Sequence, residues 1–142
     1  MRWTAYGQSK LANLMFALEL DRRLRASGSQ LKSVAAHPGY AATNLQTAAA
    51  PALDRIVMRA SNLLFAQSAA MGALPTLYAA TAPGVEGGTY YGPDGLGEFR
   101  GHPHVSTPSS AARDAAKARR LWEVSEQLTG VSFSLPAPAG AA

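Results

Sequence analysis

Only two segments of this 142-residue chain have the composition of a β-strand. Residues 31–37 end in an apolar run, and residues 87–92 place aromatic and β-branched side chains between glycines. Apolar residues at three- and four-residue spacing predict helices over 3–25, 51–65, 67–80 and 110–129. Helices between strands are typical of parallel crossover units. A parallel sheet of two strands is not stable alone, because both of its faces and both of its edges need to be covered. We therefore expect the chain to form part of a larger α/β sheet.

The ends of the predicted helices carry specific signals. Gly28 and Gly130 each follow a helical run and can adopt the left-handed conformation of a C-terminal cap. Ser110 is the predicted N-cap of the last helix, and Pro75 is expected to kink the third. The segment 92–108, rich in Gly, Pro and His, is predicted to be a loop.

Composition excludes several kinds of chemistry. The chain has no cysteine, which removes disulfides, thiolate-bound metals, iron–sulfur clusters and thiol catalysis. With 47% hydrophobic and 15% charged residues it fits a soluble globular protein and not a disordered one. The net charge is +4, but the basic clusters 22–25 and 117–120 fall late in predicted helices. We interpret them as solvated helix faces and expect no nucleic-acid partner.

One stretch satisfies the charge criterion for a membrane span. No Asp, Glu, Lys, Arg or His lies between Arg59 and Glu86, and the interval exceeds the roughly 20 residues that a span needs. Polar residues, Gly72 and Pro75 interrupt it, so a buried pair of helices is the preferred interpretation, with no stable membrane span. The opening residues 1–6 lack the pattern of a secretory signal, and we expect a cytoplasmic protein.

Tyr6 and Lys10 are four residues apart on the first predicted helix. This spacing leaves them about 40° apart around the helix and roughly 6 Å apart along it, so both side chains can reach one ligand. A nearby ammonium favours the phenolate form of a tyrosine, as general acid–base catalysis requires, and it can also hold a ribose hydroxyl. The bare pair is common by chance, and a partly buried phenol beside a surface amine is the structural alternative.

Two segments carry a resemblance to a known family. The run Ala-Tyr-Gly-Gln-Ser-Lys-Leu-Ala-Asn-Leu over residues 5–14 resembles the catalytic helix of the short-chain dehydrogenase/reductase family, in its retinol-dehydrogenase-like and protochlorophyllide-reductase-like branch. The segment 37–45, His-Pro-Gly-Tyr-Ala-Ala-Thr-Asn-Leu, is similar to that family's Pro-Gly-x-x-x-Thr motif. Residues 72–91 and 121–131 also resemble the branch, less specifically.

The resemblance implies a fold and an activity. Residues 1–134 would be the C-terminal half of a Rossmann-like doubly wound parallel sheet with flanking helices, followed by a flexible tail over 135–142. The implied enzyme is an NAD(P)-dependent oxidoreductase that interconverts an alcohol and a carbonyl by hydride transfer. Tyr6 would be its acid or base, and Lys10 would support the tyrosine and orient the nicotinamide ribose. The implied cofactor-binding residues are Tyr6, Lys10, Pro38, Gly39, Tyr40 and Thr43.

The cofactor itself is implied only in part. NAD or NADP would serve, and the family favours NADP. The sequence contains no Gly-x-x-x-Gly-x-Gly after a strand, no Asn-Ala-Gly segment and no catalytic serine before Tyr6. The glycines of 95–101 have the wrong spacing and lead into His102-Pro103 instead of a helix. We therefore expect the N-terminal cofactor half to be absent and the chain alone not to bind the cofactor.

The absence of these family motifs from the sequence leaves a second function class open. The alternative is a truncated, non-catalytic α/β fragment, stable only by self-association or by pairing with another chain. Apolar surface left exposed on the catalytic helix predicts a homo-oligomer or a complex with the missing half.

The resemblance also implies a substrate class. Residues 48–65 correspond to a substrate-binding lid, and the apolar side chains on and next to it favour a small apolar alcohol or carbonyl compound. These side chains are Leu45, Leu53, Ile56, Leu63 and Phe65.

The remaining histidines and the C-terminal tryptophan have structural interpretations. His37, at a strand end, is predicted to be a hydrogen-bonded structural residue. His102 and His104 form a His-x-His pair, but neither a third histidine nor a carboxylate cluster accompanies them, so no metal site is expected. Leu121 and Trp122 are predicted to be core or interface anchors.

Overall fold

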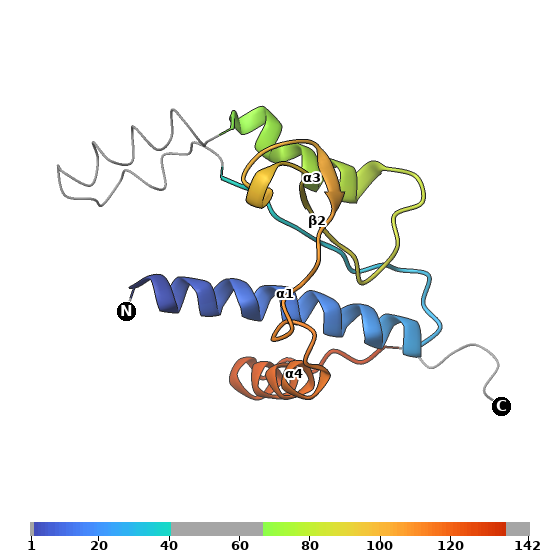
Figure 1. The fold of residues 1–142 in the computed structure, drawn as a ribbon. Helices are drawn as coiled ribbons and strands as arrows, with labels where there is room; N and C mark the ends of the chain where they lie inside the picture. Colours follow the sequence, from blue (N-terminus) through green and yellow to red (C-terminus); the bar gives the residue numbers. More distant parts are fainter. Residues whose placement is uncertain (1, 41–66, 136–142) are drawn as a thin grey trace. The chain divides into compact units, whose positions relative to one another are not determined.

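The computed structural model describes residues 2–40 and 67–135 (Figure 1). Thr43, the predicted helix 51–65 and the apolar residues of the lid lie outside the described residues, as does nearly all of the predicted tail. The described residues form two compact units. The first contains residues 2–35, 85–89 and 107–135, and the second contains residues 36–40, 67–84 and 90–106.

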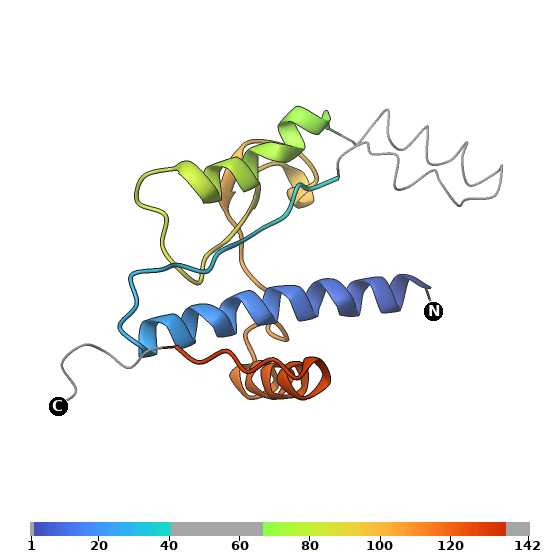
Figure 2. The same ribbon diagram turned by 180° about the vertical axis from the view of Figure 1, so that it is seen from behind.

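Two helices build the first unit. Helix α1 (Arg2–Ala26) confirms the helix predicted over 3–25, and α4 (Ala115–Thr129) lies beside it in both views (Figures 1 and 2). Between them Trp122, 3% exposed, stacks on Phe16 with ring centroids 4.8 Å apart. The predicted anchor role of Trp122 is confirmed. The apolar core of this unit comprises Met15, Ala112 and Ala118, with Leu11, Leu14 and Leu121 packed against it.

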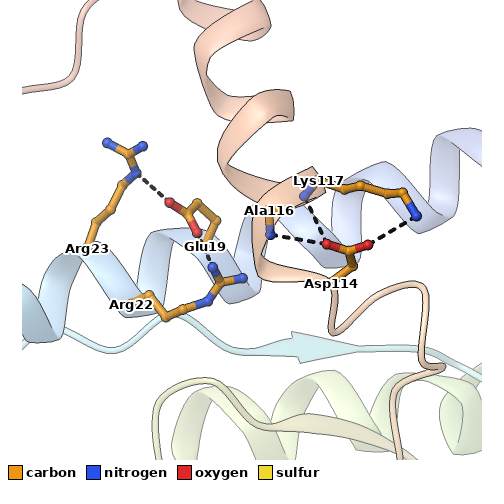
Figure 3. Close-up of polar contacts among 6 residues, drawn as sticks. All are labelled: Glu19, Arg22, Arg23, Asp114, Ala116 and Lys117. Carbon is orange, nitrogen blue, oxygen red and sulfur yellow. Dashed lines mark hydrogen bonds and ion pairs between the residues drawn. The ribbon is translucent and has the colours of Figure 1, made fainter.

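The ends of these helices follow their local sequence. Gly28 takes φ 71° after α1, and the Ser29 N–H donates to the Leu24 carbonyl at 3.0 Å. Gly130 takes φ 69° after α4, so both predicted C-terminal caps are confirmed. The predicted start of α4 is wrong, because Asp114 and not Ser110 is its N-cap (Figure 3). The Asp114 carboxylate accepts from two backbone N–H groups of the first turn, which a capping side chain must do.

Buried carboxylates organise the basic end of α1. Glu19, 3% exposed, forms ion pairs with Arg22 and Arg23 on the same helix (Figure 3). Asp21, also 3% exposed, bonds Arg25 at 2.6 Å and accepts from the Ser33 N–H at 3.3 Å. The cluster at 22–25 is therefore engaged in ion pairs within α1.

Within residues 2–40 and 67–135 the sheet has three short strands, in the order β1 (Ala35–Ala36), β2 (Tyr90–Pro93) and β3 (Pro103–Val105). The Ala35 N–H donates to the Thr89 carbonyl and the His37 N–H donates to the Tyr91 carbonyl, so β1 and β2 advance in the same direction. This parallel pair, with α3 packed against β2, confirms the α/β class.

Two strand predictions need correction. The strand expected over 31–37 is reduced to β1, since the Ser33 N–H bonds the Asp21 carboxylate instead of a neighbouring strand. The segment 92–108 is not wholly a loop, because it holds the short 3₁₀ helix η2 (Leu96–Glu98) and strand β3. Strand β3 pairs antiparallel with β2. The hydrogen bonds of this pairing stabilise a strand in a segment whose composition is that of a loop.

Helix α3 (Ala69–Thr81) packs against β2 in the second unit, where the rings of Tyr78 and Tyr91 lie 5.4 Å apart. It confirms the helix predicted over 67–80, with the buried Pro75 inside it. Within the described part of the chain, no helix is both long and apolar enough to cross a membrane.

Candidate active site

Tyr6 and Lys10 lie together on the N-terminal part of α1. The Lys10 ammonium is 5.4 Å from the centroid of the Tyr6 ring, as the spacing on a helix predicts. Tyr6 is 51% exposed, and every residue from Thr4 to Lys10 is exposed in the structure. A phenol and an ammonium are thus presented on one accessible helix face, where a ligand can reach both.

Gly39 forms a tight turn after β1 in the second unit. Its φ is +64°, and a Cβ added here would lie 2.5 Å from the Phe99 carbonyl oxygen and 2.8 Å from Pro93 Cγ. Both the backbone conformation and the close approach require a residue without a side chain. The chain is also fixed after the turn, because the Tyr40 N–H donates to the Phe99 carbonyl at 2.7 Å.

Gln67 also forms hydrogen bonds to the Pro38–Gly39 turn and to Tyr40 after it. It is 7% exposed, and its Nε2 donates to the Pro38 carbonyl at 2.7 Å while its Oε1 accepts from the Gly101 N–H at 3.1 Å. The Gln67 N–H in turn donates to the Tyr40 carbonyl at 2.9 Å. One buried amide therefore connects the turn to the segment that follows η2.

His37 contacts the same turn through one ring nitrogen and Glu98 through the other. Its Nε2 lies 2.9 Å from Glu98 Oε2, and its Nδ1 accepts from the Gly39 N–H at 3.3 Å. The other Glu98 oxygen lies 3.8 Å from Nε2 of His104, whose Nδ1 bonds the Gly92 carbonyl. The predicted structural role of His37 is confirmed by these bonds.

Tyr90 lies beside this cluster, with its ring centroid 5.0 Å from that of His37. Burial raises the pKa of Tyr90, and the negative charge of Glu98 raises it further. The phenol of Tyr90 therefore keeps its proton to a higher pH than a free tyrosine does.

The predicted site residues fall into two groups. Tyr6 and Lys10 belong to the first unit, whereas Pro38, Gly39 and Tyr40 belong to the second, where they form one continuous turn. Among the described residues, His102 and His104 included, no three His, Cys, Asp or Glu side chains are placed so that they could hold a metal ion.

Sequence reasoning did not identify Gln67 or Glu98. Gln67 contacts Pro38, 29 positions away in the sequence, and Glu98 contacts His37, 61 positions away. No local sequence pattern marks such contacts. The local signal next to Glu98 is Gly97, since glycine marks a turn.

The fold and the two groups of residues define a class of protein. Parallel strands that alternate with helices along the chain are typical of an α/β domain. No protein-family model matches the chain.

Comparisons with individual proteins are more specific. The chain is 35% identical over 124 residues to "Short-chain dehydrogenase TIC 32 B, chloroplastic" of Brassica napus, which covers 87% of this chain and 36% of that protein. It is 34% identical over 127 residues to "Retinol dehydrogenase 14" of Mus musculus, covering 89% of this chain and 35% of that protein.

A solved structure is also similar to this chain. The crystal structure of an uncharacterized protein from Mycobacterium paratuberculosis is 42% identical, with a TM-score of 0.68, over 94% of this chain and 41% of that one. The chain belongs to the short-chain dehydrogenase/reductase family. It spans about a third of the length of the curated relatives named above.

Proposed function

We propose that this chain supplies the acid–base helix and the cofactor-facing turn of an NAD(P)-dependent oxidoreductase acting on an alcohol or a carbonyl. The observation that supports this most strongly is the pairing of Tyr6 with Lys10 on the exposed face of α1. The family relationship supports the coarser assignment to oxidoreductases.

The residues present suit a nicotinamide cofactor. An ammonium offers three donors to the hydroxyls of a ribose, and a phenol four residues earlier can reach the same ligand. When bound, the cofactor would supply or accept the hydride. Lys10 would hold the ribose, and the turn formed by Pro38, Gly39 and Tyr40 would line the cofactor together with Thr43.

The chain's own part in the reaction is proton transfer at Tyr6. In carbonyl reduction the Tyr6 hydroxyl would donate its proton to the carbonyl oxygen, and in alcohol oxidation the phenolate would remove the hydroxyl proton. The positive charge of Lys10 would stabilise the phenolate that this step leaves behind. The apolar composition of residues 45–65 supports a small apolar substrate, and the family favours NADP over NAD.

Lys10 provides the experiment that tests the proposal. We would join this chain behind the part of the Mycobacterium paratuberculosis protein that precedes the matching region, and assay carbonyl reduction with NADPH and NADH. We expect Lys10→Met to raise the KM for the cofactor and lower kcat in this fusion protein. Lys117→Met, a change of the same type at an exposed lysine on α4, is the matched control. Equal activity of the two variants would contradict the proposal.

A non-catalytic role is the second candidate. Exposed apolar side chains on α1, Tyr6 at 51% and Phe16 at 40%, favour a chain that is stabilised by self-association or by another chain. Light scattering on the purified chain tests this candidate, because a well-behaved monomer would contradict it.

A further inference from the structure

Glu98 has a backbone conformation that its side chain disfavours. Its φ is 56°, and it is the one non-glycine residue with positive φ in the described part of the chain. A left-handed conformation brings Cβ close to the following carbonyl, so glycine or asparagine would fit this position with less strain. A strained residue that persists indicates that its side chain has a role.

The side chain of Glu98 is placed between two histidines. Its Oε2 lies 2.9 Å from His37 Nε2, and its Oε1 lies 3.8 Å from His104 Nε2. The other ionisable group at this point is Tyr90, whose ring packs against His37.

His37 transmits this contact to the backbone of the turn. The Gly39 N–H can only donate, so Nδ1 of His37 must accept and the proton of a neutral ring must be on Nε2. That Nε2–H points to the Glu98 carboxylate, which accepts it. A chain of two hydrogen bonds therefore runs from the Glu98 carboxylate through the His37 ring to the Gly39 backbone.

We infer that Glu98 is a positioning residue that acts through His37 to hold the Pro38–Gly39 turn in one orientation. The functional meaning of this role rests on the proposed function, in which that turn lines the nicotinamide cofactor. The carbonyls of Glu98 and Phe99 lie against Gly39 as well, so the strained segment fixes the turn by packing and by hydrogen bonding together.

Nuclear magnetic resonance on the ¹⁵N-labelled full chain tests the inference without cofactor or substrate. At about pH 8, where a model imidazole is neutral, the His37 ring signals should report a single Nε2–H tautomer. The Gly39 amide should show protection from hydrogen exchange. In Glu98→Ala we expect mixed tautomers of His37 and loss of the Gly39 protection.

Conservative and relaxed variants separate positioning from general stability. Glu98→Gln keeps an oxygen that can accept from Nε2–H, so it should restore both parent signals. Glu98→Gly relieves the backbone strain, and it should lose the His37 and Gly39 signatures without loss of thermal stability. Glu86→Ala, at an exposed glutamate in the first unit, is the matched control, and the Ala118 amide of α4 is the internal reference.

Two results would overturn the positioning role. One is a Glu98→Ala chain that keeps both the parent His37 tautomer and the Gly39 protection. The other is a chain that loses protection equally at Gly39 and Ala118, which would show a purely global effect on folding. Neither readout depends on Tyr6, so failure of the oxidoreductase proposal would leave these results interpretable.

Discussion

Gly39 combines two demands at a single residue, because its φ of +64° is strained for any other residue and its neighbours leave no room for a side chain. Gly84 shares a positive φ, at +76°, but nothing lies within 4 Å of the Cβ it would carry. Comparing Gly39 with Gly84 therefore separates the cost of a positive φ from the cost of steric overlap. The Pro-Gly motif predicted a role for Gly39, and the positive φ and the close contacts explain why glycine is required there.

We predict that Gly39→Ala destabilises the chain by more than Gly84→Ala does. The left-handed conformation alone costs about 1–2 kcal/mol for a residue with Cβ, and Gly84→Ala should show that amount. Gly39→Ala adds overlap with the Phe99 carbonyl oxygen. Urea unfolding of the two variants measures the difference, and equal free energies of unfolding would refute the steric account.

Tyr90 gives a prediction for high pH. Burial and the Glu98 charge raise its pKa, so the folded chain keeps a proton that the unfolded chain loses first. The resulting stabilisation is complete below about pH 10, the ordinary tyrosine value, and it is lost as the pH rises through the raised pKa. Tyr90→Phe should remove this part of the pH dependence.

The two causes of that shift can be separated with Glu98→Gln. Because burial is the larger cause, this variant should lower the pKa of Tyr90 while leaving it above the ordinary value. A titration that follows the Tyr90 ring signals by nuclear magnetic resonance provides the measurement. An unchanged pKa would show that Glu98 does not act on Tyr90.

At the scale of elements, the start of α4 depends on Asp114. Its Oδ1 accepts from the backbone N–H groups of Ala116 and Lys117 at 3.1 and 3.0 Å, and its Oδ2 lies 3.0 Å from the Lys117 ammonium (Figure 3). These interactions, chiefly the hydrogen bond from the Lys117 backbone, lower the pKa of Asp114. The helix start is therefore sensitive to acid.

We predict that Asp114→Ala lowers the melting temperature and that Asp114→Asn retains most of it, because asparagine can still cap the helix. Since the folded pKa is depressed, the charge-dependent stabilisation is present above the ordinary aspartate pKa of 3.8 and lost as the pH falls through the lower folded pKa. Lys117→Met removes only the side-chain ion pair and should have a small effect. Thermal melts at neutral and acid pH measure these differences, and a Lys117→Met loss as large as that of Asp114→Ala would contradict capping as the cause.

Elements with local signals could be predicted from the sequence, and elements made by distant contacts could not. The spacing of Leu11, Leu14 and Met15 and the glycine at position 28 were sufficient to predict α1 and its end. Strand β3 was missed because it exists through its pairing with β2. The same reason explains the candidate site: a fixed spacing on one helix predicted Tyr6 with Lys10, whereas Glu98 reaches His37 across 61 positions.

At the scale of the whole molecule, cofactor affinity tests whether the residues of this chain suffice to bind a dinucleotide. The pyrophosphate of a dinucleotide is usually bound by a glycine-rich turn at a helix N-terminus, and this sequence contains no such motif. We therefore predict negligible binding of NADPH or NADH by the chain alone in calorimetric titration. Saturable binding in the micromolar range would show that the remaining residues suffice.

Our central claim is that Tyr6 is the acid–base group of an alcohol–carbonyl oxidoreductase. The most direct measurement is the rate of carbonyl reduction by the fusion protein described above, with Tyr6→Phe compared to parent. General acid–base catalysis contributes about 10²–10⁴-fold, so we expect kcat to fall by about 10²-fold or more. Tyr78→Phe, the same change at an exposed tyrosine on α3, should leave the rate unchanged. A Tyr6→Phe fusion protein as active as its parent would contradict the account.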